Sequence, residues 1–290
     1  MFVLQNTAEA VKAYFLERLI HQFTEREILM FYKESMKKRL KLSETELILQ
    51  KDIRVSESDL LFFRSVVKRL FKHEPFQYII GETFFYDLTI RCDERALIPR
   101  PETEELVDWV INSLDSSKSH KILDMCTGTG CIALALKSKL TNSKLFATDL
   151  SQEALALAKK NAMLLNQGVD FIEENALVND SDNFEMNSLD VIVSNPPYIP
   201  LKDKSQMDKN VLDFEPHMAL FVSDENPLIF YKSIAEKASS LLKPTGYLFF
   251  EIHEDYGAQT KELIESLGFD EVELKLDLQG KYRMLRAKKN

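Results

Sequence analysis

The sequence predicts an α/β protein in which a small helical bundle precedes an open, largely parallel sheet wrapped by helices. Two observations support this fold class. From Pro99 onward, short apolar runs alternate with longer segments of helical periodicity, which is typical of strand–helix units. Before residue 76, only helical periodicity is visible and glycine is absent. We therefore expect a helical domain at residues 1–75, a linker at residues 76–98 and an α/β domain at residues 99–290.

The first 75 residues carry signals that begin amphipathic helices. A serine or threonine stands three places before an acidic residue in pairs that match or resemble the capping box: Thr24 with Glu27, Ser43 with Glu46, and Ser56 with Asp59. This segment has more basic than acidic residues, although the whole chain has a formal net charge of −9. We interpret its basic run, residues 33–41, as a solvated helix face, with a partner-binding patch as the alternative.

Residues 76–98 change to an aromatic and β-branched composition around Gly81. Such residues favour strands, and a glycine between them favours a turn. We expect a β-hairpin linker that includes residues 76–79.

The remaining chain is expected to form seven strands, each a short apolar run followed by turn-forming residues. They lie at residues 121–125, 144–149, 170–174, 189–194, 247–251, 271–276 and 282–287. Helices fall between them, notably at residues 131–140, 151–165, 227–242 and 259–267. Gly268 is suited to end the last of these helices, because glycine readily adopts the left-handed conformation found there.

Composition excludes several classes of protein. No apolar run is long enough to span a bilayer, and the first residues lack the basic start and apolar centre of a signal peptide. The 3 cysteines and 5 histidines have no spacing typical of disulfide or zinc sites. The acidic net charge argues against stable nucleic-acid binding. We therefore expect a cytoplasmic protein without metal or membrane attachment, and a monomer, because no apolar stripe is left for self-association.

The predicted strand at residues 121–125 runs directly into a glycine-bearing loop and then into an apolar helix. The chain has only 8 glycines, and two of them, Gly128 and Gly130, are in this loop. Glycine permits a sharp turn and close approach of the backbone to a ligand, and the helix start offers free N–H groups. The loop lacks the lysine of phosphate-binding loops and the spacing of dinucleotide-binding loops. We interpret it as a nucleotide site that does not hold a phosphate, a reading that the acidic Asp124 supports.

Asp149 ends the next predicted strand, about twenty residues beyond the glycine loop. In open α/β sheets, an acidic side chain at this place accepts hydrogen bonds from ribose hydroxyls. The alternative is that Asp149 helps to cap the helix that begins near Ser151.

Asn195-Pro196-Pro197-Tyr198 follows the predicted strand at residues 189–194. The prolines fix two successive φ angles and remove two backbone donors, so the turn offers acceptors only. The side-chain oxygen of Asn195 and the carbonyl of Pro196 can accept both N–H bonds of a planar NH2 group, with the Tyr198 ring covering it. The turn therefore favours an amide or amine substrate, and an ordinary strand-ending turn is the alternative. All three loops leave the carboxyl ends of strands, where such sheets bind ligands.

Together, the segment Asp124 to Gly130, Asp149 and the Asn-Pro-Pro-Tyr turn resemble the class I S-adenosylmethionine-dependent methyltransferases that methylate nitrogen, which have a Rossmann-like seven-stranded domain. Further segments resemble the release factor glutamine methyltransferase family: residues 74–81, 97–104, 215–216 with 219–220, and 277–283. The resemblance spans about residues 70–290, and the helical front end agrees with the family's substrate-binding domain in type only.

The resemblance implies methyl transfer from S-adenosylmethionine to the side-chain amide nitrogen (N5) of the glutamine in the Gly-Gly-Gln motif of class I peptide chain release factors, which tunes translation termination. It implies catalytic roles for Asn195, Pro196 and Tyr198, and substrate binding by these residues with Pro197. The implied cofactor-binding residues are Asp124, Cys126, Thr127, Gly128, Thr129, Gly130, Asp149, Leu150, Asn175, Ala176 and Asn195. We expect the helix that begins within residues 99–104 to cover the cofactor, and Glu251 to support the site rather than catalyse.

Two residues depart from the family pattern. Cys126 stands at the first position of the usual Gly-x-Gly-x-Gly loop, and Ala176 stands where relatives often have an aromatic residue near the adenine. Three alternative functions remain open: methylation of a ribosomal protein glutamine, methylation of an adenine or cytosine amino group, and a module that binds without turnover. Residues 99–104 favour release factors over the ribosomal protein, no basic channel or insert supports a nucleic-acid substrate, and Cys126 alone supports the non-catalytic module.

Overall fold

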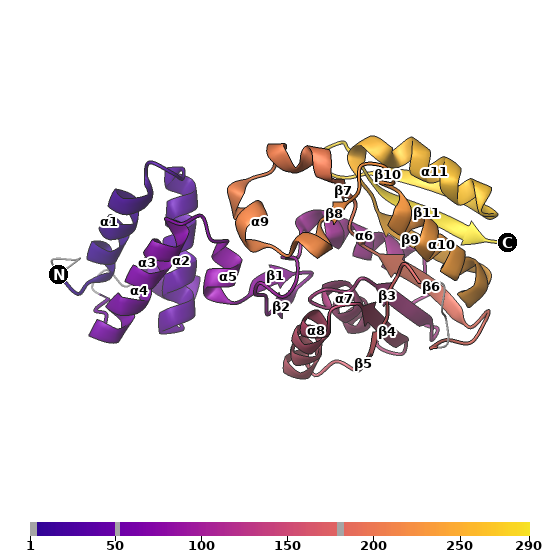
Figure 1. The fold of residues 1–290 in the computed structure, drawn as a ribbon. Coiled ribbons are helices and arrows are strands. Elements are labelled where there is room, and N and C mark those ends of the chain that lie inside the picture. Colours follow the sequence, from indigo (N-terminus) through magenta and orange to yellow (C-terminus); the bar gives the residue numbers. More distant parts are fainter. Residues whose placement is uncertain (1–4, 50–52, 179–182) are drawn as a thin grey trace. The chain divides into compact units, whose positions relative to one another are not determined.

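The computed structural model describes residues 5–49, 53–178 and 183–290 and divides into two compact units (Figure 1). The first unit runs to Gly81 and includes Asp208–Phe214. The second unit comprises Glu82–Met207 and Glu215–Asn290. Nowhere in these described ranges is a helix both long enough and apolar enough to cross a membrane.

The first unit is helical. Its helices are α1 (Ala8–Leu19), α2 (Glu25–Leu40), α3 (Glu44–Leu49), α4 (Glu57–Leu70), α5 (Phe76–Ile80) and α9 (Lys209–Phe214). All three predicted capping pairs form reciprocal hydrogen bonds at the starts of α2, α3 and α4. The fully buried rings of Phe15 and Phe63 meet edge to face inside this unit, with centroids 6.4 Å apart.

The expectation that residues 76–79 belong to a β-hairpin is wrong. They form α5, which Pro75 precedes and Gly81 ends in a left-handed conformation with φ of 77°. Proline before the first turn and glycine after the last are helix-boundary signals, and here they outweigh the strand-like composition. The hairpin consists of β1 (Thr83–Phe85) and β2 (Leu88–Ile90).

The second unit contains a seven-stranded sheet in the order β10-β11-β9-β6-β3-β4-β5. The strands are β3 (Lys121–Met125), β4 (Lys144–Asp149), β5 (Val169–Glu173), β6 (Leu189–Ser194), β9 (Leu242–Glu251), β10 (Phe269–Leu276) and β11 (Tyr282–Lys289). All seven predicted strands are present. The neighbouring strands β9, β6, β3, β4 and β5 pair in parallel. Strand β11 is antiparallel to both of its neighbours, β9 and β10. The sheet is therefore largely parallel, as predicted.

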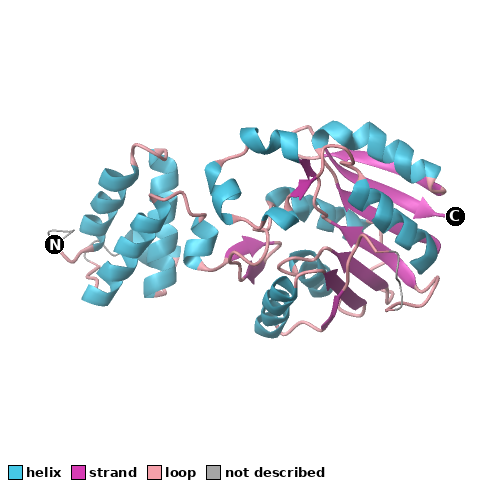
Figure 2. Cartoon of the chain, viewed as in Figure 1, coloured by secondary structure: helices cyan, strands magenta, loops and turns pink. Residues whose placement is uncertain are grey.

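Helices cover both faces of this sheet (Figure 2). They are α6 (Pro101–Asn112), α7 (Cys131–Lys139), α8 (Gln152–Leu165), α10 (Ile229–Leu241) and α11 (Gly257–Ser266). Successive strand residues serve opposite faces: Ile122 packs in the core with α6 and α7, and Leu123 packs in the core with α10 and α11. Gly268 follows α11 with φ of 87°, which confirms its role as a helix stop.

Several short elements were not predicted. β7 (Ile199–Pro200) pairs in parallel with β8 (Phe221–Val222), and 3-10 turns lie at Leu201–Gln206, His217–Ala219 and Glu254–Tyr256. Elements of two or three residues carry no periodicity, so sequence patterns do not reveal them.

Candidate active site

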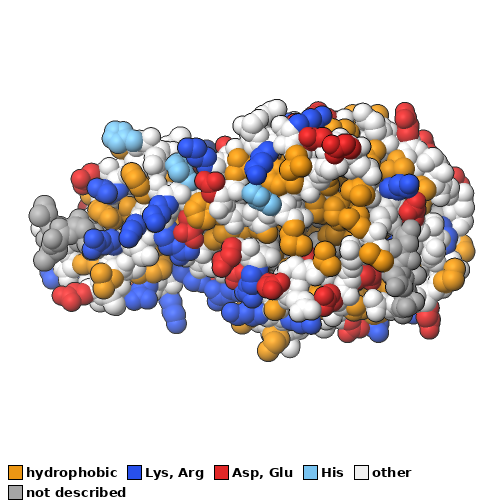
Figure 3. Space-filling model, in the orientation of Figure 1, with side chains coloured by type: hydrophobic (Ala, Val, Ile, Leu, Met, Phe, Trp, Pro, Cys, Tyr) orange, Lys and Arg blue, Asp and Glu red, His pale blue; other side chains and the backbone are white. Residues whose placement is uncertain are grey.

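A cavity of about 470 Å³ lies in the α/β unit, at the carboxyl ends of β3, β4 and β6. Figure 3 shows hydrophobic side chains gathered over this hollowed part of the unit. Ten of the residues predicted for the site line the cavity: Cys126, Thr127, Gly128, Thr129, Asp149, Leu150, Asn175, Ala176, Asn195 and Pro197. Asp124, Gly130, Pro196 and Tyr198 are not among the lining residues. Loops that are distant in the sequence therefore meet where the open sheet predicts a ligand site.

The glycine loop needs a left-handed backbone at alternate positions. The φ angles are 61° at Cys126, 55° at Gly128 and 82° at Gly130. Glycine adopts this conformation without strain, whereas an L-residue with a side chain pays roughly 1–2 kcal/mol. At Gly130 an added Cβ would also come within 3.1 Å of the Ala158 Cβ. Cys126, which stands where the family pattern has glycine, therefore keeps the loop's left-handed backbone conformation and adds local strain.

Asp124 lies beneath this loop, fully buried at the end of β3. Its Oδ2 accepts hydrogen bonds from the Thr127 hydroxyl at 2.5 Å and the Ala133 backbone N–H at 3.2 Å. Burial raises the pKa of Asp124 to about 7, against the effect of these two hydrogen bonds. Asp124 thus braces the loop and the start of α7.

This buried carboxyl predicts a pH-dependent stability. Its pKa of about 7 in the folded state exceeds the value near 4 of an unfolded chain, so between these values the folded state holds an extra proton. The contribution of Asp124 to the free energy of unfolding therefore falls as the pH rises through this window, by up to about 1.4 kcal/mol per unit. Asp124→Asn should gain stability relative to the parent as the pH rises from about 5 to 7. Urea denaturation followed by Trp109 fluorescence measures this, and a pH-independent difference would contradict it.

Asp149 connects the end of β4 to two neighbouring loops. Its Oδ2 accepts from the Gly128 backbone N–H at 2.8 Å, and its Oδ1 accepts from the Ser151 N–H at 2.9 Å. The N-cap of α8 is Ser151 itself, whose hydroxyl accepts from the Ala154 N–H. Burial raises the pKa of Asp149. The carboxylate therefore holds the glycine loop against the cavity and lines the cavity at the same time.

Helix α10 holds the loop of Asn175 and Ala176, a support that the sequence did not predict. The ammonium group of Lys237 is 2.5 Å from the Glu174 carboxylate and donates to the Asn175 carbonyl at 3.0 Å. The Ser233 hydroxyl donates to the Ala176 carbonyl at 2.6 Å. Lys237 and Ser233 are about sixty residues away along the chain, so no local signal pointed to them.

Two segments used in the resemblance, residues 97–104 and 215–216, meet in the same unit. The buried carboxylate of Glu215 accepts from the Ile98 backbone N–H at 3.0 Å and from the Arg100 guanidinium at 2.5 Å. Ile98 and Arg100 both line the cavity. Apolar lining residues that the sequence did not single out include Met218, Phe221, Ile229 and Phe230.

The Asn-Pro-Pro-Tyr turn is fixed by a series of side-chain hydrogen bonds. The Asn195 Nδ2 donates to the Thr103 Oγ1 at 3.2 Å, and the Thr103 hydroxyl donates to the Glu251 Oε2 at 2.6 Å. The Tyr198 hydroxyl donates to the Glu251 Oε1 at 2.9 Å. Within the described ranges, the Asn195 Oδ1 accepts no hydrogen bond, so it is available to a ligand in the cavity.

The half-buried Tyr198 is held by its ring and its hydroxyl. The ring meets His253 edge to face with centroids 6.0 Å apart, and the hydroxyl is bound to Glu251. The carboxylate of Glu251 raises the pKa of Tyr198 in addition to the larger effect of burial. The role of Tyr198 over a substrate amide stays a prediction. Among the described residues, no group of acidic, histidine or cysteine side chains is arranged to hold a metal ion.

Comparisons with known proteins show what this chain is similar to. The family model of the methyltransferase small domain matches residues 107–213, and that of the PrmC N-terminal domain matches residues 33–81. A release factor glutamine methyltransferase of Flavobacterium psychrophilum is 42% identical over 276 residues, covering 94% of this chain and 96% of the relative. One from Bacteroides thetaiotaomicron is 41% identical over 242 residues, covering 83% and 86%.

A solved structure is similar in fold. The crystal structure of a methyltransferase from Pyrococcus furiosus superimposes with a TM-score of 0.51 at 19% identity, covering 70% of this chain and 89% of that chain. The predicted Rossmann-like methyltransferase fold is thereby confirmed.

Proposed function

Because this chain belongs to the family of release factor glutamine methyltransferases, we propose that it methylates the side-chain amide nitrogen of the glutamine in the Gly-Gly-Gln motif of class I peptide chain release factors, with S-adenosylmethionine as the methyl donor. The observation that carries this proposal is the Asn195 amide. It lines the cavity with its nitrogen bound to Thr103, which leaves the Oδ1 to accept from a substrate NH2 group.

The cavity fits S-adenosylmethionine in size and in chemistry. Its volume of about 470 Å³ is within the range of roughly 300–1,000 Å³ typical of small-molecule sites. The left-handed glycine loop permits close approach of the backbone. Each Asp149 oxygen already accepts one backbone N–H and keeps a further lone pair, which suits the ribose hydroxyls. Leu150, Asn175 and Ala176 line the wall where the adenine would lie. When bound, the cofactor supplies an electrophilic methyl group.

The protein's contribution to the reaction is placement. An amide nitrogen is a poor nucleophile because its lone pair is delocalised. Holding that nitrogen in line with the methyl group can lower the barrier by several kcal/mol, up to roughly 7–11 kcal/mol in ideal cases. The Asn195 Oδ1, which lines the cavity, accepts one of the two N–H bonds and so fixes the amide. The role of the Pro196 carbonyl as acceptor of the other stays a prediction, because Pro196 is not among the lining residues.

The same acceptors favour the transition state over the ground state. As the nitrogen becomes tetrahedral it gains positive charge and its N–H bonds become stronger donors. Acceptors already aimed at these hydrogens stabilise that charge without reorganising. No strong general base is required for the methyl transfer itself, because the positively charged N-methylamide is strongly acidic and gives up one N–H proton to solvent water. S-adenosylhomocysteine is the other product.

The helical unit would bind the release factor outside its Gly-Gly-Gln loop, in keeping with the match of its residues 33–81 to the PrmC N-terminal domain. We also propose that the protein is cytoplasmic, because translation termination takes place in the cytoplasm. We propose that it is a monomer, because the proposed reaction needs only one copy of the site.

An assay with competing substrates tests this function. The purified protein is given radiolabelled S-adenosylmethionine with a class I release factor, ribosomal proteins and tRNA side by side. Label should enter the release factor, and mass spectrometry of its peptides should place one methyl group on the motif glutamine. A release factor with Gln→Glu in the motif is the matched control and should stay unlabelled. Label in ribosomal protein or tRNA, with an unlabelled release factor, would refute the proposal.

A further inference from the structure

Two hydrogen bonds run from Asn195 through Thr103 to Glu251, and in each the donor is the group nearer to Asn195. Thr103, from the first turn of α6, has a single hydroxyl proton, and it is donated to the Glu251 carboxylate at 2.6 Å. Towards Asn195 the Thr103 oxygen can then act only as an acceptor. The Asn195 NH2 group must therefore face Thr103, and its Oδ1 must face away from Thr103.

This direction decides which atom meets the substrate. A primary amide is nearly symmetric in shape, so packing alone distinguishes its oxygen from its nitrogen poorly. If the Thr103 hydroxyl were free to donate, it could accommodate the Asn195 oxygen, and the amide could turn over. The Asn195 NH2 group would then confront the substrate NH2 group, donor against donor. The acceptor that the proposed mechanism needs would be lost.

Glu251 is the final acceptor of these hydrogen bonds. It is buried at the end of β9, and it accepts from Thr103 on one oxygen and from Tyr198 on the other. A protonated carboxyl would turn an O–H donor towards one of these hydroxyls and would accept only weakly there, whereas a carboxylate accepts from both. The pair of contacts therefore matches the ionised form.

The positive charge of Arg283 acts on Glu251. Burial raises the pKa of Glu251, while the hydrogen bonds from Thr103 and Tyr198 and the charge of Arg283 oppose this shift and Glu102 adds to it. Arg283 is held in place by Asp277, with Nε to Oδ2 at 3.2 Å, and by Glu254, with Nη2 to Oε2 at 2.9 Å.

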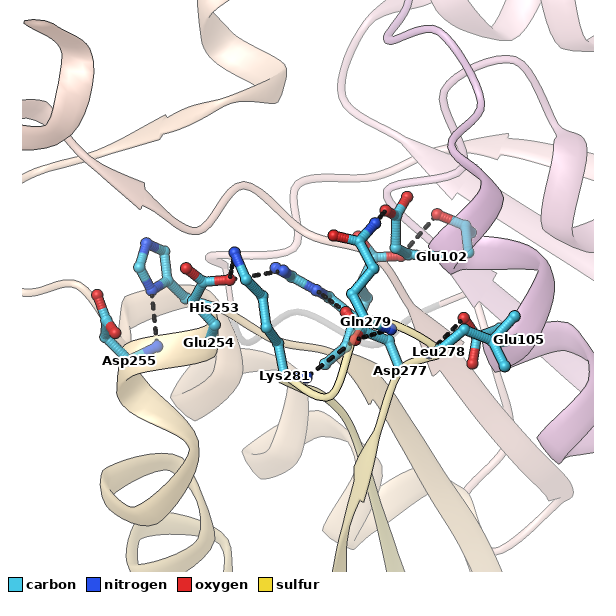
Figure 4. Close-up of polar contacts among 12 residues, drawn as sticks. Glu102, Glu105, His253, Glu254, Asp255, Asp277, Leu278, Gln279 and Lys281 are labelled. Atoms are coloured by element: carbon cyan, nitrogen blue, oxygen red, sulfur yellow. Dashed lines mark hydrogen bonds and ion pairs between the residues drawn. The ribbon is translucent and has the colours of Figure 1, made fainter. Parts of the chain in front are cut away.

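The turn that carries Asp277 is itself rigid. The Asp277 Oδ1 accepts from the backbone N–H groups of Gln279 and Lys281, both at 2.9 Å. The Gln279 amide donates to Glu102 on α6, and the Lys281 ammonium is 2.7 Å from Glu254 (Figure 4). The turn between β10 and β11 thus ties α6 to the strand that bears Arg283.

We propose that Thr103 and Glu251 are positioning residues that orient the Asn195 amide, so that its oxygen rather than its nitrogen faces the substrate. This inference rests on the proposed function, in which that oxygen accepts from the glutamine amide. Thr103 lines the cavity, and in this proposal both residues act through Asn195 and not on the reacting atoms.

Matched threonine variants test the inference. Thr103→Val removes the hydroxyl at nearly constant volume, Thr103→Ser keeps it, and Thr260→Val is the control. Thr260 is another fully buried threonine of the same unit, and its hydroxyl donates to the Tyr256 carbonyl. Thr103→Val should lower kcat on the release factor by about 10- to 100-fold, with the cofactor Kd within about twofold. Thr103→Ser and Thr260→Val should keep kcat within about threefold. Equal losses in Thr103→Val and Thr103→Ser, or no loss in either, would overturn the inference.

A double-mutant cycle with Glu251→Gln gives a second measurement. The glutamine side chain offers one acceptor in place of two, so Thr103 or Tyr198 must turn. If Glu251 acts on Asn195 only through Thr103, the double variant Thr103→Val with Glu251→Gln should lose no more kcat than the worse single variant. Losses that multiply would show independent roles and overturn the inference. If Thr103→Val fails to fold, the loss in Glu251→Gln alone decides, and an unchanged kcat would count against the inference.

Failure of the proposed function is a separate result. It would appear in the parent protein, as a release factor that stays unlabelled. The ratios between variant and parent can still be measured on whichever amide or amine the parent does methylate.

Discussion

Asn195→Ala is expected to lower kcat for release factor methylation by at least about 100-fold, while the Kd of the cofactor stays within about twofold. The substitution removes a side-chain oxygen that lines the cavity and that the structure leaves open to the substrate NH2 group. That oxygen interacts more strongly with the charged nitrogen of the transition state than with the planar amide, so its loss affects kcat most. Single-turnover kinetics and calorimetric titration of the cofactor measure the two quantities.

Asn112→Ala is the matched control, because Asn112 is an exposed asparagine at the last position of α6. It should leave both quantities unchanged. A parallel fall of kcat and cofactor affinity in Asn195→Ala would mean that Asn195 supports the fold or the cofactor site and not the substrate amide. The assignment of the Asn-Pro-Pro-Tyr turn as the substrate cradle would then be lost.

Lys237→Met is expected to lower the free energy of unfolding of the α/β unit by about 3–5 kcal/mol. The side chains of Lys237 and Glu174 are only 1% and 6% exposed, with nitrogen and oxygen 2.5 Å apart. Removing the cation leaves a carboxylate buried without its partner, which is far costlier than the loss of a surface pair. The Asn175 carbonyl also loses a donor, so cofactor affinity should fall with stability.

Urea denaturation followed by Trp109 fluorescence measures this effect, because the single tryptophan packs in the core of the same unit. Lys232→Met is the matched control on the same helix. Its side chain is 58% exposed and lies 3.9 Å from Glu236, so the change should stay within about 0.5 kcal/mol. Adding Glu174→Leu to Lys237→Met should restore much of the loss, since an apolar pair replaces a buried ion pair at little cost. A loss as small as that of the control would show that the pair is not a stabilising support.

The strands and the glycine loop could be predicted because they depend on local properties. The β3, β4 and β6 boundaries follow from apolar runs that end at turn-forming residues. The left-handed angles at Gly128 and Gly130 follow from the conformations that only glycine adopts freely. Where two local signals conflicted, composition misled: residues 76–79 have strand-like side chains, but Pro75 and Gly81 bound a helix.

The sequence by itself determined the order of strands and helices along the chain, the capping boxes, the loop at Gly128 and the place of the proline turn at Asn195, because backbone restrictions and periodicity act between near neighbours. Only the tertiary structure decided the partners of the site. Thr103 and Glu251 are 148 residues apart, Asn195 and Thr103 are 92 apart, and Lys237 and Glu174 are 63 apart. Contacts over such separations arise from the packing of α6 and α10 on the sheet, and no pattern within one segment specifies which polar atoms that packing brings together.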